Sequence, residues 1–351
     1  MAMSRSPRSR PVRSARIADV AKIAGVSSAT VSRALANIDV VTEETRRKVL
    51  EAVRSTGYTP NIAARNLRKQ ETKMALVVVP DIANPFFAEV LRGVDATLSA
   101  AGYGLIIANL DNSREKEARY VDLAFARQVD GVLLLCGHVP AGSHRTLAQA
   151  NLPIVAACEI IPGADFPQVE VNNCEASEAA VAHLISLGHR RIGYISGPPA
   201  NILDVERRRG YKAALFAAGV KEDASLIFTG DFTFRGGAEA AGQVLAMPKK
   251  RQPTAVFAAN DEMAIGFLKT VHAAGRKIPE EFSIVGFDAI EYADYCEPTL
   301  TTVIQPRRDL GARAADLLID MMREHKLSSR VNVRLEATLL IRNSTAPASK
   351  G

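Results

Sequence analysis

The sequence predicts an all-α head of short helices followed by a larger α/β body with two lobes. Three observations support this fold class. Excess positive charge is confined to the first fifth of the 351 residues, and apolar residues there recur at helical spacing around a glycine. From Lys73 onward, short apolar runs alternate with helical patterns. Such alternation is typical of layered α/β structure, and the repeats are too many for one small sheet.

The charge distribution separates the two regions. Residues 1–72 contain 14 Lys and Arg against 6 Asp and Glu, a formal charge of +8, whereas the remainder contains 30 against 32, a charge of −2. A basic module on a near-neutral body is typical of nucleic-acid-binding proteins, although a solvated basic tail has the same composition. We expect residues 1–14, rich in Arg and Ser, to be a disordered tail that either adds phosphate contacts or makes none.

A helix-turn-helix is predicted within residues 15–60. Apolar residues at helical spacing begin at Ile17 and stop at Gly25, and Ser27 is a suitable N-cap for a second helix. Two short helices joined through a glycine turn form this motif. We expect Ala21, Val26 and Val31 to form its small core.

A third helix and a hinge segment follow. Thr42 is the expected N-cap of the third helix, and the two glutamates after it favour a helix start. Pro60 can then begin a short helix, so residues 61–72 are predicted to be a hinge helix and linker. A helix of this length is unstable alone in water and needs a partner surface.

These segments resemble the lactose/galactose repressor family. The resemblance is carried by IADVAKIAGVSSATVSRALAN and then TRRKVLEAVRSTGYTPNIAARNLR. It implies binding to double-stranded operator DNA, with Arg33 reading guanine in the major groove and Leu67 wedging into the minor groove. The residues that the resemblance assigns to DNA are Ser27, Ser28, Ala29, Thr30, Ser32, Arg33, Asn61, Ala64 and Leu67.

Residues 73–344 are expected to form the two-lobed body. The predicted lobes are 73–173 with 304–330, and 174–303 with 331–344. Buried parallel strands are indicated by continuous apolar runs, for example at 74–79, 131–135 and 283–287. Ligands of doubly wound sheets bind beyond the carboxyl ends of the strands, so the loops there are the candidate site.

The body lacks the usual signs of catalysis. We find no P-loop, GxGxxG, nucleophile elbow or metal-binding cluster, and the four cysteines are scattered without a CxxC pair. No run reaches the ~18 apolar residues of a membrane span, and the first residues lack a secretory signal. We therefore expect a cytoplasmic protein that is not an enzyme and needs no cofactor or metal. The rival hypotheses are an enzyme fused to a DNA-binding head and a solute-binding receptor.

The body also resembles the periplasmic-binding-protein-like (type I) sensor of the same family, so the resemblance extends from Ala15 to Ser344. The motifs NPFFAEVLRGV, GHRRIGYISGP, ERRRGY and AANDEMAIG carry it. It implies effector-binding residues at Phe86, Phe87, Arg207, Phe232, Asn260 and Asp288. Three alternatives stay open: the Phe86–Phe87 pair belongs to the core, Arg207 pairs with a carboxylate, and Asp261 caps a helix.

The resemblance also bears on ligand and assembly. Many sugar-responsive relatives have Arg two residues before Arg207, where this chain has Val205. VVVPDIANPFF, DGVLLLCG and GDFTFRGG resemble nucleoside-responsive members. We therefore expect a nucleoside effector, with a saccharide as the alternative. Since no heptad repeat follows Asn343, a homodimer is expected, whereas induction and co-repression are not distinguished.

Overall fold

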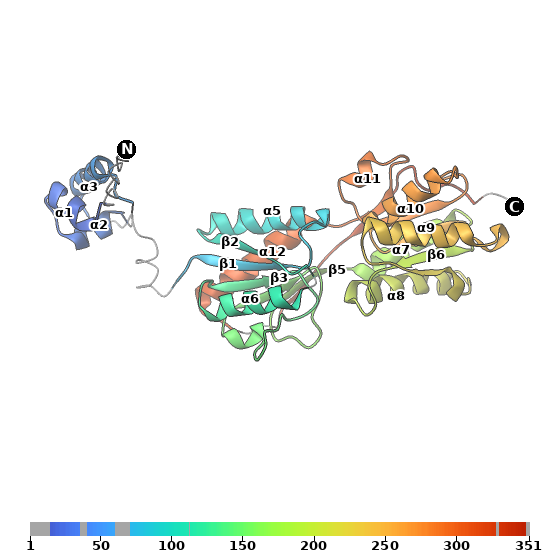
Figure 1. The fold of residues 1–351 in the computed structure, drawn as a ribbon, viewed down its shortest axis with the longest axis horizontal. Coiled ribbons are helices and arrows are strands. Elements are labelled where there is room, and N and C mark those ends of the chain that lie inside the picture. Colours follow the sequence, from blue (N-terminus) through green and yellow to red (C-terminus); the bar gives the residue numbers. More distant parts are fainter. Residues whose placement is uncertain (1–14, 36–40, 60–70, 112, 328–329, 349–351) are drawn as a thin grey trace, which may run out of the picture. The chain divides into compact units, whose positions relative to one another are not determined.

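The computed structural model describes residues 15–35, 41–59, 71–111, 113–327 and 330–348. The chain divides into two compact units, residues 1–71 and 72–351, which we call the head and the body (Figure 1).

The head contains three helices, α1 (Ile17–Ala24), α2 (Ser28–Leu35) and α3 (Glu43–Thr56). Gly25 ends α1 with a left-handed φ of 66°, a conformation that glycine adopts without steric cost. The Ser27 Oγ accepts from the Thr30 N–H at 3.1 Å, and the Thr42 Oγ1 accepts from the Thr45 N–H at 3.4 Å. Both predicted N-caps are confirmed.

The core of the head is small. Ala21 and Val31 are buried as predicted, whereas Val26 is only partly buried and packs against them. The buried core residues are Val20, Ala21, Val31, Ala34, Val49 and Ala52. Small side chains at these positions allow three short helices to pack closely.

The first lobe of the body is a six-stranded sheet in the order β11-β5-β4-β3-β1-β2, and all its strand pairs are parallel. Its strands are β1 (Met74–Val79), β2 (Gly104–Asn109), β3 (Gly131–Leu134), β4 (Ile154–Ala157), β5 (Gln168–Val171) and β11 (Asn332–Leu335). Its helices are α5 (Pro85–Ala100), α6 (Arg114–Phe125), α12 (Arg307–Glu324) and the 3-10 turn Leu147–Ala150.

The second lobe has a sheet in the order β12-β10-β9-β8-β6-β7, in which only the β10–β12 pair is antiparallel. Its strands are β6 (Ile192–Ser196), β7 (Ile227–Thr229), β8 (Ala255–Ala258), β9 (Ser283–Asp288), β10 (Thr301–Ile304) and β12 (Thr338–Leu340). Its helices are α7 (Asn173–Ser186), α8 (Ile202–Ala217), α9 (Phe234–Ala246), α10 (Asp261–Ala273) and α11 (Tyr292–Tyr295), with 3-10 turns at Ala224–Leu226 and Lys249–Arg251.

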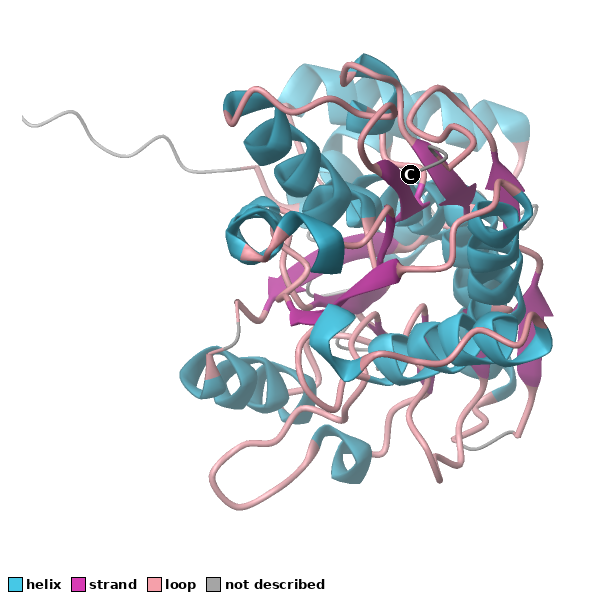
Figure 2. Ribbon diagram, turned by 90° about the vertical axis from the view of Figure 1, so that its right-hand side faces the viewer, coloured by secondary structure: helices cyan, strands magenta, loops and turns pink. Residues whose placement is uncertain are grey.

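Helices cover the sheets on both faces, as the apolar strands require (Figure 2). In β1, Val77 and Val79 join the core cluster that contains α5 and α12, whereas Leu76 and Val78 join the cluster that contains α6. Helices α5 and α12 are far apart in sequence and approach closely at Gly93 and Gly311. A Cβ at either glycine would collide with backbone of the other helix.

The chain crosses between the lobes three times, before α7, before α12 and between β11 and β12. The prediction that 331–344 belong to the second lobe was wrong for β11, which pairs with β5 of the first sheet. Only two residues separate β11 from β12, which is the loop length of a tight β-hairpin, yet the two strands belong to different sheets. The polar groups of Asn172 fix this crossing, because its N–H donates to the Leu335 carbonyl at 3.2 Å and its Oδ1 accepts from the Ala337 N–H at 2.7 Å.

Candidate ligand cleft and nucleic-acid-binding face

A cavity of about 210 Å³ lies where loops after the strands of both lobes meet, and we call it the cleft. This is the position expected for ligands of doubly wound sheets, beyond the carboxyl ends of the strands. All six side chains predicted to bind an effector line it, namely Phe86, Phe87, Arg207, Phe232, Asn260 and Asp288.

The first lobe contributes an aromatic wall to the cleft. Asn84 caps α5 by accepting from the Phe86 N–H at 2.9 Å, and Pro85 occupies the first helical turn. The rings of Phe86 and Phe87 meet edge to face with centroids 5.2 Å apart, and each residue is only 8% exposed. Both rings belong to the core cluster, so the alternative that they are core residues is confirmed, although both also line the cleft.

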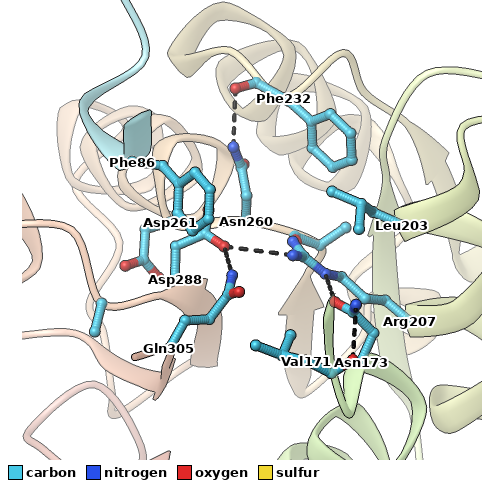
Figure 3. A network of polar contacts seen from close by, with 12 residues as sticks. Phe86, Val171, Asn173, Leu203, Arg207, Phe232, Asn260, Asp261, Asp288 and Gln305 are labelled. Carbon is cyan, nitrogen blue, oxygen red and sulfur yellow. Dashed lines mark hydrogen bonds and ion pairs between the residues drawn. The ribbon is translucent and has the colours of Figure 1, made fainter. Parts of the chain in front are cut away.

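Arg207 on α8 is the centre of a buried polar network (Figure 3). It is 2% exposed, and its Nε donates to the Asn173 Oδ1 at 3.1 Å. Its Nη2 lies 3.4 Å from the Asp288 Oδ1, and its Nη1 donates to the Ala259 carbonyl. The guanidinium also stacks 3.7 Å from the centroid of the Phe287 ring. The alternative that Arg207 pairs with a carboxylate is therefore confirmed.

Asp288 ends β9 in an unusual backbone conformation, with φ at 116°. Non-glycine residues rarely adopt such angles, and surrounding contacts must stabilise them. The Gln305 Nε2 donates to its Oδ1 at 2.6 Å. Burial raises the pKa of the Asp288 carboxyl to about 6, although the Arg207 guanidinium beside it acts in the opposite direction.

Asn260 shapes the cleft through hydrogen bonds to the protein. Its Oδ1 accepts from the Met263 N–H at 3.0 Å, which caps α10, and its Nδ2 donates to the Phe232 carbonyl at 2.9 Å. The prediction that Asp261 caps this helix was wrong, since the preceding asparagine does so. Asp261 is fully buried and accepts from the Thr302 hydroxyl at 2.5 Å and from the Ile290 N–H at 2.9 Å.

Phe232 reaches the cleft from the loop between β7 and α9. Its φ is 65°, in the left-handed region. The ring lies directly over Gly197, where a Cβ would collide with it. Because only a glycine leaves this space, the Gly197-Pro198 loop and Phe232 are matched in shape.

Further side chains of the cleft were not among the predicted effector-binding residues. Glu159, Asn201, Glu262 and Gln305 all line it. The Asn201 Nδ2 donates to the Glu159 Oε2 at 3.1 Å, and this hydrogen bond joins the two lobes. Burial raises the pKa of the Glu159 carboxyl. The signal that could have found Glu159 is its position just after a short apolar strand run, 154–157.

In the head, helix α2 carries most of the helix-turn-helix residues that are predicted to contact DNA. Ser28, Ala29 and Arg33 are exposed on α2, and Ser32 is partly buried. The hydroxyls of Ser27 and Thr30 lie 2.9 Å apart. The predicted hinge residues Asn61, Ala64 and Leu67 lie outside the described residues.

Metal ligation and membrane insertion find no support in the part of the chain that the structure describes. Within it, no group of three or more His, Cys, Asp or Glu side chains is arranged to hold a metal ion. None of its helices is both long enough and apolar enough to span a bilayer.

Comparisons with known proteins agree with the fold of both units. Residues 16–61 match the model for bacterial regulatory proteins of the lacI family, and residues 181–345 match a periplasmic binding protein-like domain. The chain is 41% identical to the HTH-type transcriptional repressor CytR of Escherichia coli (strain K12) over 93% of its own length and 95% of that protein. The chain belongs to the lacI family. Like the members of that family, this protein is a DNA-binding transcriptional regulator.

Solved structures of lacI-family regulators share its architecture. A complex of the transcriptional regulator CelR with cellobiose aligns with a TM-score of 0.71 at 32% identity, covering 94% of this chain and 99% of that one. The lac repressor dimer bound to operator and the anti-inducer ONPF aligns with a TM-score of 0.83 over 95% of this chain and 100% of that one. At 24% identity, the second likeness concerns the fold alone.

Proposed function

We propose that this lacI-family protein is a repressor that binds operator DNA as a homodimer and responds to a nucleoside bound in the cleft. The observation that carries the proposal is the combination of a helix-turn-helix head and a two-lobed cleft in one chain that is 41% identical to CytR over 93% of its length. The site of action is then the cytoplasm. The cleft would serve sensing, not catalysis, and needs no cofactor.

The DNA-binding half of the proposal uses the exposed face of α2. Arg33 reads guanine through two parallel hydrogen bonds, whereas Ser28 and Ala29 are too short for such contacts. Asn61, Ala64 and Leu67 act as a hinge whose leucine unstacks a base step. A homodimer places its two heads on the two half-sites of a near-palindromic operator.

The nucleoside half of the proposal uses aromatic side chains from both lobes. Phe87 and Phe232 enclose a planar base, and the polar network around Arg207 and Asp288 faces its sugar. By the family resemblance, many sugar-responsive relatives carry Arg at position 205 of α8, where this chain has a half-exposed valine and therefore no guanidinium. A saccharide is the second candidate, because the similar regulator CelR was solved with cellobiose.

In this proposal, ligand binding in the cleft is coupled to DNA binding by the head. Ligand binding changes the closure of the lobes, which the Glu159–Asn201 hydrogen bond and the three crossings constrain. Closure then changes the geometry with which a dimer presents its two hinge segments to DNA. The sign of the response, induction or co-repression, depends on whether the open or the closed arrangement of the lobes favours DNA binding.

A gel shift tests the DNA-binding half. Duplex fragments from promoters near the protein's own coding region are compared with shuffled duplexes at moderate salt, with and without cytidine, adenosine and a panel of sugars. We expect the protein to bind one natural fragment more tightly than the shuffled duplexes. One of the ligands should change its affinity for that fragment. Equal affinity for natural and shuffled DNA under every condition would reject the proposal.

Calorimetry tests the ligand half separately. The full chain is titrated with cytidine, adenosine, ribose, glucose and cellobiose. Heat release with a nucleoside supports the first candidate. Heat release with sugars alone rejects it in favour of the second.

A further inference from the structure

Four helices begin at the cleft, and each N-terminus is already capped by a side chain of the protein. The exposed N–H groups of a helix N-terminus are a common binding site for phosphate. Here a side-chain oxygen accepts from a first-turn N–H in every case, which withdraws one donor from any anion. The capped helices and their caps are α5 with Asn84, α8 with Asn201, α9 with Thr233 and α10 with Asn260.

The charges that line the cleft are also unfavourable to an anion. Its carboxyl side chains are Asp81, Glu159, Asp231, Glu262 and Asp288. Arg207 is the cation among the described lining residues, and its guanidinium is engaged by Asp288, Asn173 and the Ala259 carbonyl. A phosphate entering this space would meet like charges in a partly desolvated site without a cation available to pair with it.

Glu262 is the carboxyl whose hydrogen bonding is incomplete. It occupies the first turn of α10 and is only 8% exposed. Its Oε1 is buried and has no hydrogen-bond partner among the described residues. Burial raises the pKa of this carboxyl to about 7, and the nearby carboxylates of Asp288, Asp81 and Asp231 act in the same direction. A buried acceptor without a partner is costly, so a ligand that supplies a donor gains affinity there.

We propose that Glu262 is a specificity-determining residue that accepts an N–H or O–H of an uncharged ligand and, with the other carboxyls of the cleft, excludes phosphorylated ligands. The cleft thus distinguishes a nucleoside from its nucleotide, or a sugar from its phosphate ester. This inference rests on the proposed role of the cleft as the effector site.

The wild-type protein provides the first test. Calorimetric titrations at pH 7.5 compare cytidine with cytidine 5′-monophosphate, adenosine with adenosine 5′-monophosphate, and ribose with ribose 5-phosphate. In the pair whose uncharged compound binds, we expect that compound to bind at least tenfold more tightly than its phosphate ester. This ratio of affinities should be smaller at high salt, because charge repulsion is screened. A phosphate ester that binds as tightly as its parent, or no binding by any uncharged member, overturns the inference.

Variants of Glu262 provide the second test. Glu262→Gln keeps an acceptor and removes the charge, so the discrimination against the phosphate ester should fall roughly threefold to tenfold. Glu262→Met removes the acceptor and should weaken the uncharged ligand by about tenfold. The matched control Glu239→Gln, exposed on α9 and outside the cleft lining, should change neither affinity.

An unchanged discrimination ratio in a folded Glu262→Gln protein contradicts the role given to Glu262. If Glu262→Met does not fold, as thermal melting will show, the wild-type pairs and Glu262→Gln decide the question. The ligand-free gel shift reports separately on DNA binding, so failure of the proposed function is distinguishable from failure of this inference.

Discussion

The head and the body position their candidate binding residues in opposite ways. In the head, Ser28, Ala29 and Arg33 are exposed on α2, while six small buried residues hold the helices together. In the body, Arg207 and Asp288 are almost completely buried and bonded to the protein. The candidate DNA-binding residues are therefore separate from the core of the head, whereas the residues that line the cleft also stabilise the body. Substitutions should separate binding from stability in the head and affect both in the body.

The largest effect is expected for Arg207→Met. Removing the guanidinium leaves the buried Asp288 carboxylate without its cation, which should lower the free energy of unfolding of the body by about 3–5 kcal/mol and abolish the ligand response. Urea unfolding and calorimetry measure the two effects. The matched control is Arg209→Met on the same helix, whose exposed guanidinium pairs with the partly buried Glu206 and where a change below about 1 kcal/mol is expected. Equal losses in both variants would contradict the role of the network.

The next effect concerns the predicted hinge. From the family resemblance, Leu67→Ala should weaken operator binding roughly 100-fold, or about 3 kcal/mol, because the apolar wedge is lost. Ligand affinity measured on the same protein should stay within about twofold. Parallel losses in both assays would indicate misfolding and would remove the distinction between head and body.

Arg33→Ala should cost about 1–3 kcal/mol of operator affinity and relax the preference at one base pair. Unfolding of the head should be unchanged, because this side chain is exposed on α2. The control Arg54→Ala removes the same charge from an exposed position near the end of α3. Fluorescence anisotropy with a series of single-base operator variants measures both; a uniform loss across all variants would show that Arg33 contacts phosphate only.

The smallest effect is a pH dependence of the body's stability. The pKa of the Glu262 carboxyl rises from its ordinary 4.5 to about 7 on folding, so the folded state binds this proton more tightly than the unfolded state. The stability that this group contributes is complete below about pH 4.5 and is lost as the pH rises towards 7. Glu262→Gln should therefore raise the unfolding free energy at pH 8 by about 1–2 kcal/mol, with little change at pH 4.5. Denaturant melts at the two pH values check this, and an equal change at both would contradict it.

The fold class and the family could be predicted from the sequence because they depend on local patterns. Helical spacing, Gly25 and the N-caps Ser27 and Thr42 are each set by a few neighbouring residues. The apolar runs at 74–79, 131–135 and 283–287 likewise marked strands β1, β3 and β9. The difference in charge between the basic head and the near-neutral body follows from a count of charged residues alone.

Only the tertiary structure decided which side chains share the cleft and in what state. Strand β11 joins the first sheet although its spacing from β12 resembles a hairpin, and Asn260, not Asp261, caps α10. The pKa of Glu262 is raised because folding buries this side chain and brings α10 beside three other carboxyls, which no local pattern records. Pairings across long stretches of chain, together with the burial that changes a carboxyl's pKa, arise from packing of distant elements. A sequence read segment by segment does not contain them.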